Sequence, residues 1–353
     1  MKIKNNFFKN VPFKNFKDKE KNFFENIIKI NNFHFKNCKK LKSIKNKLDY
    51  FNKKIKVISD VPFLPVTIFK EFDMISINKK KVFKVLNSSG TSSTNPSKIY
   101  LDKSNSYNQQ LALKLIIENL LGNKRLPMLI IDKKSDKFSR NTINAKKAAI
   151  YGFSIFGTDY TYAIDNKDRI NYKVINNFLN KYKNQKIFIF GFTFDIYKYL
   201  IKNFEIKKLN LDFSNSILLH GGGWKKIEQN KISRFDFNRR LKNKFNIKKI
   251  RNYYGMIEQT GSIYLECACG YLTCSNLSEI IIRDEKLNPC KFGKKGLIQT
   301  LSLLPSSYPG HSILTEDVGE IVNSKKCKCN MKGTKFLVHG RNEKSEIRGC
   351  SDI

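Results

Sequence analysis

Short apolar runs of strand length, separated by helical stretches, restrict the fold of this chain more than any other feature. The segment 107–122 has helical character and ends at Gly122, a residue type that commonly terminates helices. This alternation predicts an α/β fold, and the closer spacing of the later runs predicts an added β-rich subdomain. The strand-like runs lie at 81–86, 127–132, 186–192, 216–222, 279–284 and 296–304.

The N-terminal part has a different pattern. Residues 1–60 are rich in Lys, Asn and Phe and place Phe23 and Ile27 at helical spacing, which predicts a helical cover. Pro62 and Pro65 then break any helix. No apolar run is long enough to span a bilayer, and the first residues lack the apolar stretch of a signal peptide. A cytoplasmic location with reduced thiols is therefore expected.

The chain is strongly basic, with 67 Lys and Arg against 30 Asp and Glu and a formal net charge of +37. Such a balance can indicate binding to nucleic acid or to an anionic membrane. Lysine is spread from end to end together with Asn and Ile, so a compositional bias explains the charge better than a dedicated polyanion site. Attraction of anionic substrates follows under either interpretation.

A loop rich in hydroxyl groups follows the first strand-like run. Hydroxyls and backbone N–H groups can donate to phosphate oxygens, and a glycine lets the backbone approach closely. A polar surface loop is the simpler alternative, because the spacing is not the Walker pattern. The candidate phosphate-binding residues are Ser88, Ser89, Gly90, Thr91, Ser92, Ser93 and Thr94, with Lys98 soon after.

A second loop carries three successive glycines, Gly221, Gly222 and Gly223, directly after an apolar run. Such a turn lets a flat ring or a phosphate lie against the backbone. A tight turn without a ligand is the alternative, although three glycines exceed what a turn needs.

A third loop, RNYYGMIEQTGS at 251–262, combines Tyr254, Gly255 and Glu258. The aromatic ring could stack on a base, and the carboxylate could bind the magnesium ion that accompanies phosphates. Each loop is ambiguous alone, but the order of the three indicates a nucleotide site.

This order resembles the adenylate-forming enzyme superfamily, in which a Ser/Thr/Gly phosphate loop, a glycine turn and a Tyr-Gly-x-Thr-Glu element build the ATP site. A narrower resemblance is to the acyl-protein synthetase (LuxE) family, best known from bacterial fatty-acid reductase complexes. It runs from about residue 60 to the end and rests on VPFLPVTIFKEF, SSGTSSTNPSKIYLD, HGGGWK, YGMIEQTGSIYLEC, SLLPSSYPGHSILTEDVGEI and GRNEKSEIRGCSD.

The resemblance implies a large adenylation domain with α/β and β-rich subdomains that lacks the usual mobile C-terminal domain. On this basis we expect a helical N-terminal cover at 1–60 and an adenylation domain at 61–339 that contains a zinc-binding subregion at 265–330. A hinge motif and a short C-terminal tail would occupy 340–353.

The resemblance also implies an AMP-forming ligase that works in two steps. A carboxylic acid, which the family resemblance implies is a fatty acid, reacts with ATP to give an acyl-adenylate and pyrophosphate. The acyl group then moves to an enzyme cysteine and on to a partner such as an acyl reductase. One alternative passes the acyl group to coenzyme A or a carrier protein, and another is a zinc-stabilised basic protein that binds nucleic acid.

Carried over by position, the resemblance assigns a role to each candidate residue. Ser88 through Thr94 would hold the phosphates, Gly221 to Gly223 would form the floor under adenine, and Tyr254 would stack on it. Glu258 would bind Mg²⁺, Asp317 would bind the ribose hydroxyls, and Arg341 would open the hinge.

The chain departs from the superfamily pattern at three points. Ile257 replaces the threonine of the Tyr-Gly element, and Ser93 replaces a glycine of the phosphate loop. The catalytic lysine of the mobile domain has no counterpart, so either the first step proceeds without it or Lys98 or Lys344 substitutes.

Cysteine pairs suggest a metal site. Cys267 and Cys269, and Cys327 and Cys329, are short-spaced pairs that suit tetrahedral thiolate binding of zinc, and the resembling family carries similar residues. We predict these four as ligands of a structural zinc, with Cys274 as a substitute for one of them. The alternative is a set of buried thiols that pack as small apolar groups.

A last cysteine, Cys350, lies three residues from the end in EIRGCSDI. Nearby Arg341, Lys344 and Arg348 would favour its thiolate. In the resembling family the acyl-accepting cysteine lies near the C-terminus, which implies this role for Cys350.

Overall fold

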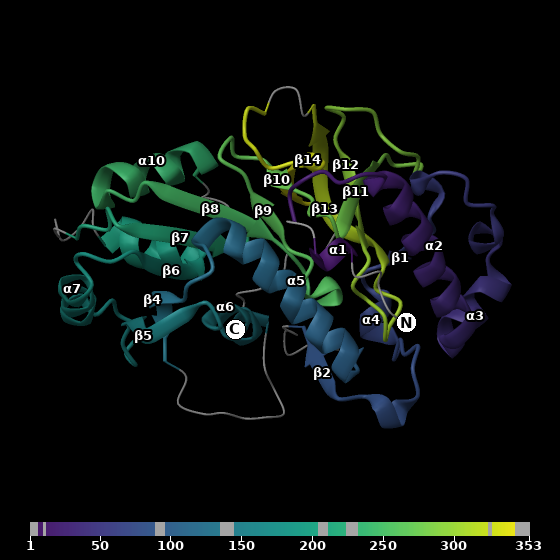
Figure 1. Ribbon diagram of the computed structural model, residues 1–353, viewed down its shortest axis with the longest axis horizontal. Helices are drawn as coiled ribbons and strands as arrows, with labels where there is room; N and C mark the ends of the chain where they lie inside the picture. Colours follow the sequence, from purple (N-terminus) through teal and green to yellow (C-terminus); the bar gives the residue numbers. More distant parts are fainter. Residues whose placement is uncertain are drawn as a thin grey trace. The chain divides into compact units, whose positions relative to one another are not determined.

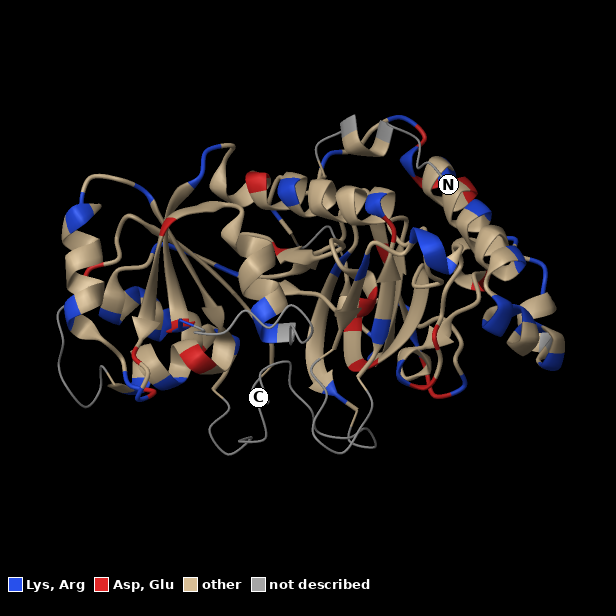
Figure 2. Ribbon diagram, turned by 90° about the horizontal axis from the view of Figure 1, so that it is seen from below, with Lys and Arg blue, Asp and Glu red and all other residues tan. Residues whose placement is uncertain are grey.

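The computed structural model describes residues 6–9, 12–88, 96–134, 145–203, 211–223, 232–323 and 327–342. The chain divides into unit 1, residues 1–120 and 254–346, and unit 2, residues 121–253 and 347–353. No helix of the described residues is long and apolar enough to cross a membrane. Lys and Arg occur on elements of both units (Figure 2).

Unit 2 is built on a parallel sheet with the strand order β8-β7-β6-β4-β5 (Figure 1). The order reverses between β4 and β6, which is the mark of a doubly wound α/β fold. Its elements are β4 (Leu126–Lys133), α6 (Ala145–Ser154), β5 (Gly157–Ile164), α7 (Tyr172–Lys181), β6 (Ile187–Phe192), α8 (Thr193–Asp195), η4 (Ile196–Lys202), β7 (Ser216–Gly221), α10 (Arg234–Phe245) and β8 (Lys249–Tyr254).

The burial pattern explains why the predicted strands form this sheet. All residues of β6 and β7 are buried, as expected for parallel strands covered on both faces. Ile189 and Leu218 belong to one apolar cluster with Phe237 and Leu241 of α10. The start of α10 is fixed by Ser233, whose hydroxyl accepts a hydrogen bond from the Asp236 N–H at 3.0 Å.

Unit 1 contains an antiparallel sheet with the order β11-β12-β13-β14-β10-β9, and β1 pairs in parallel with β13. A separate pair, β2 and β3, forms a small antiparallel sheet. The strands are β1 (Leu64–Pro65), β2 (Lys84–Asn87), β3 (Lys98–Leu101), β9 (Tyr264–Glu266), β10 (Leu272–Thr273), β11 (Ser278–Arg283), β12 (Gly296–Ser302), β13 (Ser312–Val322) and β14 (Lys335–Arg341).

Helices of unit 1 lie mainly before residue 122. Phe23 and Ile27 of α2 share an apolar cluster with Leu301 of β12, so the helix predicted at the N-terminus packs onto the sheet. The proposed division at residues 60 and 339 stays a prediction. The helical elements are α1 (Asn6–Lys9), α2 (Lys19–Asn37), α3 (Lys39–Lys47), η1 (Asp49–Asn52), η2 (Ile58–Asp60), α4 (Ile68–Glu71), η3 (Lys79–Lys81), α5 (Lys103–Leu121) and η6 (Ile257–Gln259).

Two elements begin three or more residues away from the sequence-based expectation. The helix expected from residue 107 begins at Lys103, because the Asp102 carboxylate accepts a hydrogen bond from the Asn105 N–H at 2.7 Å and caps the first turn. The strand expected at 81–86 begins only at Lys84, because the preceding residues form the turn η3.

Candidate active site and cysteine cluster

The β13–β14 hairpin of unit 1 brings the predicted ribose-binding aspartate next to the predicted hinge arginine. Asp317 and Arg341 face each other in the antiparallel register. The Tyr254 hydroxyl donates a hydrogen bond of 2.6 Å to Asp317 Oδ2. Arg341 Nη1 lies 3.8 Å from Glu316 Oε2. Three predicted site residues therefore meet at one place in the fold.

The electrostatics of this group follow from its burial. Burial raises the pKa of Asp317, while the hydrogen bond from Tyr254 and the Arg341 charge act in the opposite direction. Burial and the Asp317 charge both raise the pKa of Tyr254 well above its ordinary value, so its hydroxyl stays protonated and donates. The bond engages one of the two carboxylate oxygens, and a carboxylate can accept further donors such as ribose hydroxyls.

Glu258, the predicted magnesium ligand, lies in η6 of the same unit and is only 6% exposed. Burial raises the pKa of its carboxyl group. Its own backbone and the charges of Lys70 and Arg341 act in the opposite direction. A bound cation would strengthen that opposing effect, because a positive charge favours the ionised carboxylate.

The substitution of isoleucine at position 257 has a packing explanation. Ile257 is partly buried against an apolar cluster that includes Phe69, Ile99 and Ile313. A Cβ added to the nearby Gly255 would lie only 3.1 Å from the Ile263 side chain, so the turn before η6 is closely packed.

Two hydrogen bonds join Ser88 and Ser97, the residues that flank most of the predicted phosphate loop. The Ser97 N–H donates to Ser88 Oγ at 2.8 Å, and the Ser88 N–H donates to the Ser97 carbonyl at 3.0 Å. Lys98 is exposed at the start of β3. The other loop residues, Ser89, Gly90, Thr91, Ser92, Ser93 and Thr94, lie outside the described residues, as do Lys344 and Cys350.

The glycine turn closes β7 in unit 2. A Cβ on Gly221 would overlap the ring of Tyr253, its partner in β8. Gly222 has φ +77°, in the left-handed region that favours glycine. Among the described residues other than its chain neighbours, none has an atom within 4 Å of the position that a Cβ on Gly223 would take. The first two glycines are thus required by packing and conformation, whereas no contact with the described residues requires the third.

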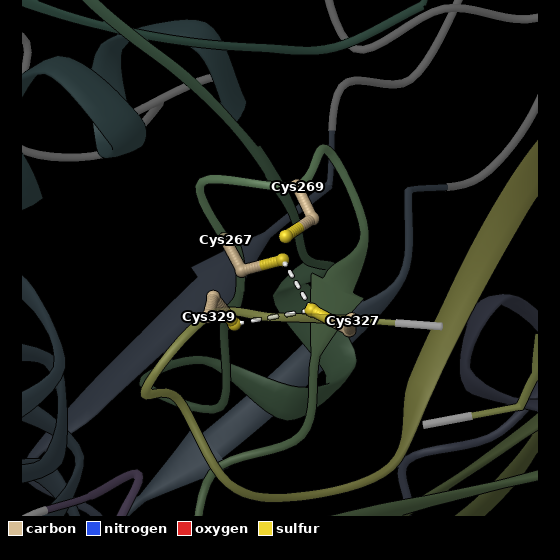
Figure 3. Close-up of side chains that lie close together, drawn as sticks. All are labelled: Cys267, Cys269, Cys327 and Cys329. Atoms are coloured by element: carbon tan, nitrogen blue, oxygen red, sulfur yellow. Dashed lines mark hydrogen bonds between the residues drawn. The ribbon is translucent and has the colours of Figure 1, made fainter. Parts of the chain in front are cut away.

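The four predicted cysteine ligands lie together in unit 1 (Figure 3). Their sulfur atoms are all within 4.8 Å of one another. Cys267 Sγ is 3.6 Å from Cys327 Sγ, and Cys327 Sγ is 3.2 Å from Cys329 Sγ, so these are free thiols rather than disulfides. Tetrahedral zinc with bonds of about 2.3 Å places sulfur atoms about 3.8 Å apart. The group can hold a metal ion.

Strand pairing brings the two cysteine pairs together. One pair lies between β9 and β10, where Gly270 N–H donates to the Cys267 carbonyl at 2.9 Å, and the other lies between β13 and β14. The antiparallel pairing of β10 with β14 places the two loops side by side. Cys274 is buried beyond β10 and lies outside the group, so the predicted substitute is not needed.

The thiols in this group have different acidities. Burial raises the pKa of Cys327 to about 12. Burial also acts to raise the pKa of Cys267, but hydrogen bonds from the backbone of Tyr271 and Cys269 and from neighbouring thiols outweigh it and hold the pKa below its ordinary value. One thiolate is therefore favoured first, and a metal cation would favour the ionisation of the others.

Comparison with known proteins decides the family. The profile of the acyl-protein synthetase (LuxE) family matches residues 1–353. This chain belongs to that family. A long-chain-fatty-acid–luciferin-component ligase of Aliivibrio fischeri is 25% identical over 281 residues, which cover 74% of this chain and 69% of that protein. The Vibrio harveyi ligase of the same name is 22% identical over 310 residues, with 83% and 77% covered.

Solved structures with the same fold are adenylate-forming ligases. The 2-hydroxyisobutyryl-CoA ligase in the postadenylation state with 2-HIB-AMP has a TM-score of 0.68 at 12% identity, with 94% of this chain and 69% of that chain covered. Its open conformation with 2-HIB-AMP and CoA has a TM-score of 0.69 at 12% identity, with 96% and 78% covered. The predicted adenylation fold is confirmed. Family membership confirms the predicted AMP-forming ligase that activates an acid as an acyl-adenylate.

Two histidines, His220 and His311, are buried and lie in hydrogen-bond networks. His220 Nδ1 lies 2.9 Å from the Thr193 hydroxyl. His311 Nε2 donates to Asn31 Oδ1 at 3.1 Å, and its ring stacks on that of His34 with a centroid distance of 5.1 Å. Thr193 carried no signal in the sequence, because an isolated threonine after an apolar run has no characteristic pattern.

Proposed function

We propose that this chain activates a long-chain fatty acid with ATP and transfers the acyl group to Cys350. The observation that carries the residue assignment is the meeting of Tyr254, Asp317 and Arg341 at the β13–β14 hairpin. The names of the Aliivibrio and Vibrio relatives support the substrate class.

In the first step a carboxylate oxygen of the fatty acid attacks the α-phosphorus of ATP. The bond from that phosphorus to the bridging oxygen breaks, pyrophosphate leaves, and an acyl-adenylate remains. Little covalent work falls to the protein in such a transfer, so its residues mainly position the reactants and neutralise charge.

Unit 1 supplies the polar groups for this step. Asp317 accepts hydrogen bonds from the ribose hydroxyls with the oxygen that Tyr254 does not engage. Tyr254 stacks on the adenine ring. Glu258 would hold Mg²⁺, which would supply positive charge near the phosphates, and the loop from Ser88 to Thr94 would donate to their oxygens. Arg341 adds positive charge next to Asp317 and marks the hinge.

In this proposal Gly221 to Gly223 form the floor under adenine. Gly223 supports this role, because no described residue other than its chain neighbours has an atom within 4 Å of the position that its Cβ would take. A flat ring can lie against such a backbone without a clash.

In the second step the Cys350 thiolate attacks the acyl carbon of the adenylate. The bond from that carbon to the phosphate oxygen breaks, AMP leaves, and a thioester forms. We propose an acyl reductase as the partner that accepts the acyl group from Cys350, since a thioester is a suitable donor to a second thiol.

The cysteine group binds a structural zinc ion in this proposal. Cys267, Cys269, Cys327 and Cys329 are the ligands, and their sulfur spacing fits tetrahedral coordination. Four thiolates leave no coordination position for a substrate, so the ion links two loops and takes no part in the reaction.

The test uses ATP, Mg²⁺ and a radiolabelled long-chain fatty acid with the full chain. Pyrophosphate exchange reports the first step, and a denaturing gel with or without hydroxylamine reports the thioester. Cys350→Ser should keep exchange within about twofold and lose the label, because only the second step needs the thiol.

Cys290→Ser is the matched control, since Cys290 is a partly exposed thiol outside the cysteine group. It should keep both activities. Label that persists on Cys350→Ser would overturn the acyl-cysteine assignment, and label that moves to added coenzyme A would identify that acceptor instead. Absence of exchange with every fatty acid would overturn the substrate class.

A further inference from the structure

A buried hydroxyl lies directly after β6, at the carboxyl edge of the parallel sheet of unit 2. Thr193 is the first residue of α8 and is 7% exposed. Its Oγ1 donates to the Gly221 carbonyl at 3.1 Å and lies 2.9 Å from His220 Nδ1. One side chain on β6's edge therefore contacts two successive residues at the end of β7.

The proton positions in this group follow from counting donors. A threonine hydroxyl has a single hydrogen, and here it is donated to the Gly221 carbonyl. Both contacts are satisfied as hydrogen bonds when the imidazole carries its hydrogen on Nδ1 and donates it to Thr193 Oγ1. In this arrangement His220 donates to Thr193, and Thr193 donates to the Gly221 carbonyl.

The histidine is held in its neutral form. His220 is 2% exposed, and burial lowers its pKa to about 3. Its ring lies 4.9 Å from the Phe237 ring between centroids. Because protonation is disfavoured, the ring stays neutral across the neutral pH range.

The hydrogen bond from Thr193 restricts the backbone of the glycine turn. Gly221 and Gly222 have no side chains to pack, and glycine loses more backbone freedom on ordering than any other residue. The parallel ladder ends at the pairing of Gly221 with Phe192 and Tyr253. Beyond that pairing, the hydrogen bond from Thr193 fixes the orientation of the last peptide group before the turn.

The position in the topology agrees with a role near a ligand. In doubly wound sheets, ligands bind outside the carboxyl ends of strands where the strand order reverses. In unit 2 that point lies between β4 and β6, and Thr193 immediately follows β6.

We propose that Thr193 is a positioning residue for ATP, and that it acts by fixing the Gly221 carbonyl and hence the glycine turn. The inference rests on the proposed role of Gly221 to Gly223 as the floor under adenine. Thr193 acts through the backbone, with His220 orienting its hydroxyl, and this threonine and histidine together set the affinity for the nucleotide rather than the rate of the chemical step.

The experiment compares Thr193→Val with Thr193→Ser in acid-dependent pyrophosphate exchange. Valine keeps the shape but removes the hydroxyl, so KM for ATP should rise about tenfold with kcat within about threefold. Serine restores the hydroxyl and should return KM to within about twofold of wild type. Calorimetric titration with ATP alone should show the same order of affinities.

Ser216→Ala is the matched control. Ser216 is the first residue of β7, at the opposite end of that strand from Gly221, and its buried hydroxyl donates to the Phe213 carbonyl at 2.6 Å. Loss of this hydroxyl should lower the free energy of unfolding about as much as Thr193→Val does, while KM for ATP stays unchanged. If Ser216→Ala raised KM as much as Thr193→Val, or if Thr193→Val left KM unchanged, the proposal would be wrong.

If Thr193→Val fails to fold, a second pair of variants at His220 tests the same proposal. His220→Leu removes the donor to Thr193 and should raise KM for ATP about threefold, whereas His220→Asn retains an N–H donor and should restore it. Equal KM values for the two would overturn the proposal. Failure of the proposed function is distinguishable, because the wild type itself would then show no exchange.

Discussion

The two ends of the β13–β14 hairpin hold groups of opposite character. At the loop end, Cys327 and Cys329 join two cysteines of another loop, so four like groups converge. At the open end, the carboxylate of Asp317 meets the Tyr254 hydroxyl and faces Arg341 across the strand pair. Roughly 17 Å of strand separates the ends, from five residues at about 3.3 Å each.

The two ends differ in whether they need an added ion. The cysteine group needs a cation, whereas Tyr254 and Asp317 already form a complementary donor and acceptor. Four ionised thiols repel one another, so their convergence becomes favourable when a cation binds them. The donor and acceptor at the open end satisfy each other without an added ion. We infer that the loop end contributes stability and that the open end contributes to the reaction.

The largest expected effect is on activity at the open end. Asp317→Asn keeps the acceptor for Tyr254 but removes the charge, and pyrophosphate exchange should fall by about 100-fold or more. The metal content should not change. The control is Glu316→Gln, the neighbouring carboxylate, whose half-exposed pair with Arg341 at 3.8 Å should matter less than about threefold. Equal losses in both variants would contradict the assignment to Asp317.

An intermediate effect is expected on stability at the loop end. Cys327→Ser should lower the zinc content measured by mass spectrometry from one ion per chain to near zero. The melting temperature should fall by about 5 °C, corresponding to about 2 kcal/mol, while exchange falls less than about tenfold. Cys290→Ser should match wild type in both measurements. Full zinc content in Cys327→Ser would remove Cys327 from the ligand set.

The smallest expected effect is a difference in pH dependence. Burial raises the pKa of Asp317, so the folded state binds its proton at a higher pH than the unfolded state does. The unfolding free energy of wild type relative to Asp317→Asn should therefore rise as the pH falls through the raised pKa, and level off below the unfolded value.

The loop end should respond with the opposite sign. Metal binding requires deprotonated thiols, so the stability advantage of wild type over Cys327→Ser should shrink as the pH falls. Urea unfolding of the three proteins between about pH 7.5 and pH 4 measures both differences. If both changed in the same direction, the two ends would not be the distinct kinds of site described above.

Much of the fold was predictable, because continuous apolar runs such as 186–192 can be buried on both faces only as inner strands. Short cysteine spacings likewise indicated a metal site, since the two members of each pair are close in any conformation. The start of α5 was placed too late, because the capping role of Asp102 depends on one hydrogen bond that periodicity does not reveal.

The sequence by itself determined the strand and helix types, the cysteine pairs and the family motifs, because these depend on residues near one another in the chain. The tertiary structure decided which groups meet. It excluded Cys274 from the thiol group, joined Tyr254 to Asp317 and placed Thr193 against Gly221. Each of these contacts depends on the pairing of distant strands, and a shift of one residue in register would turn the side chains to the other face.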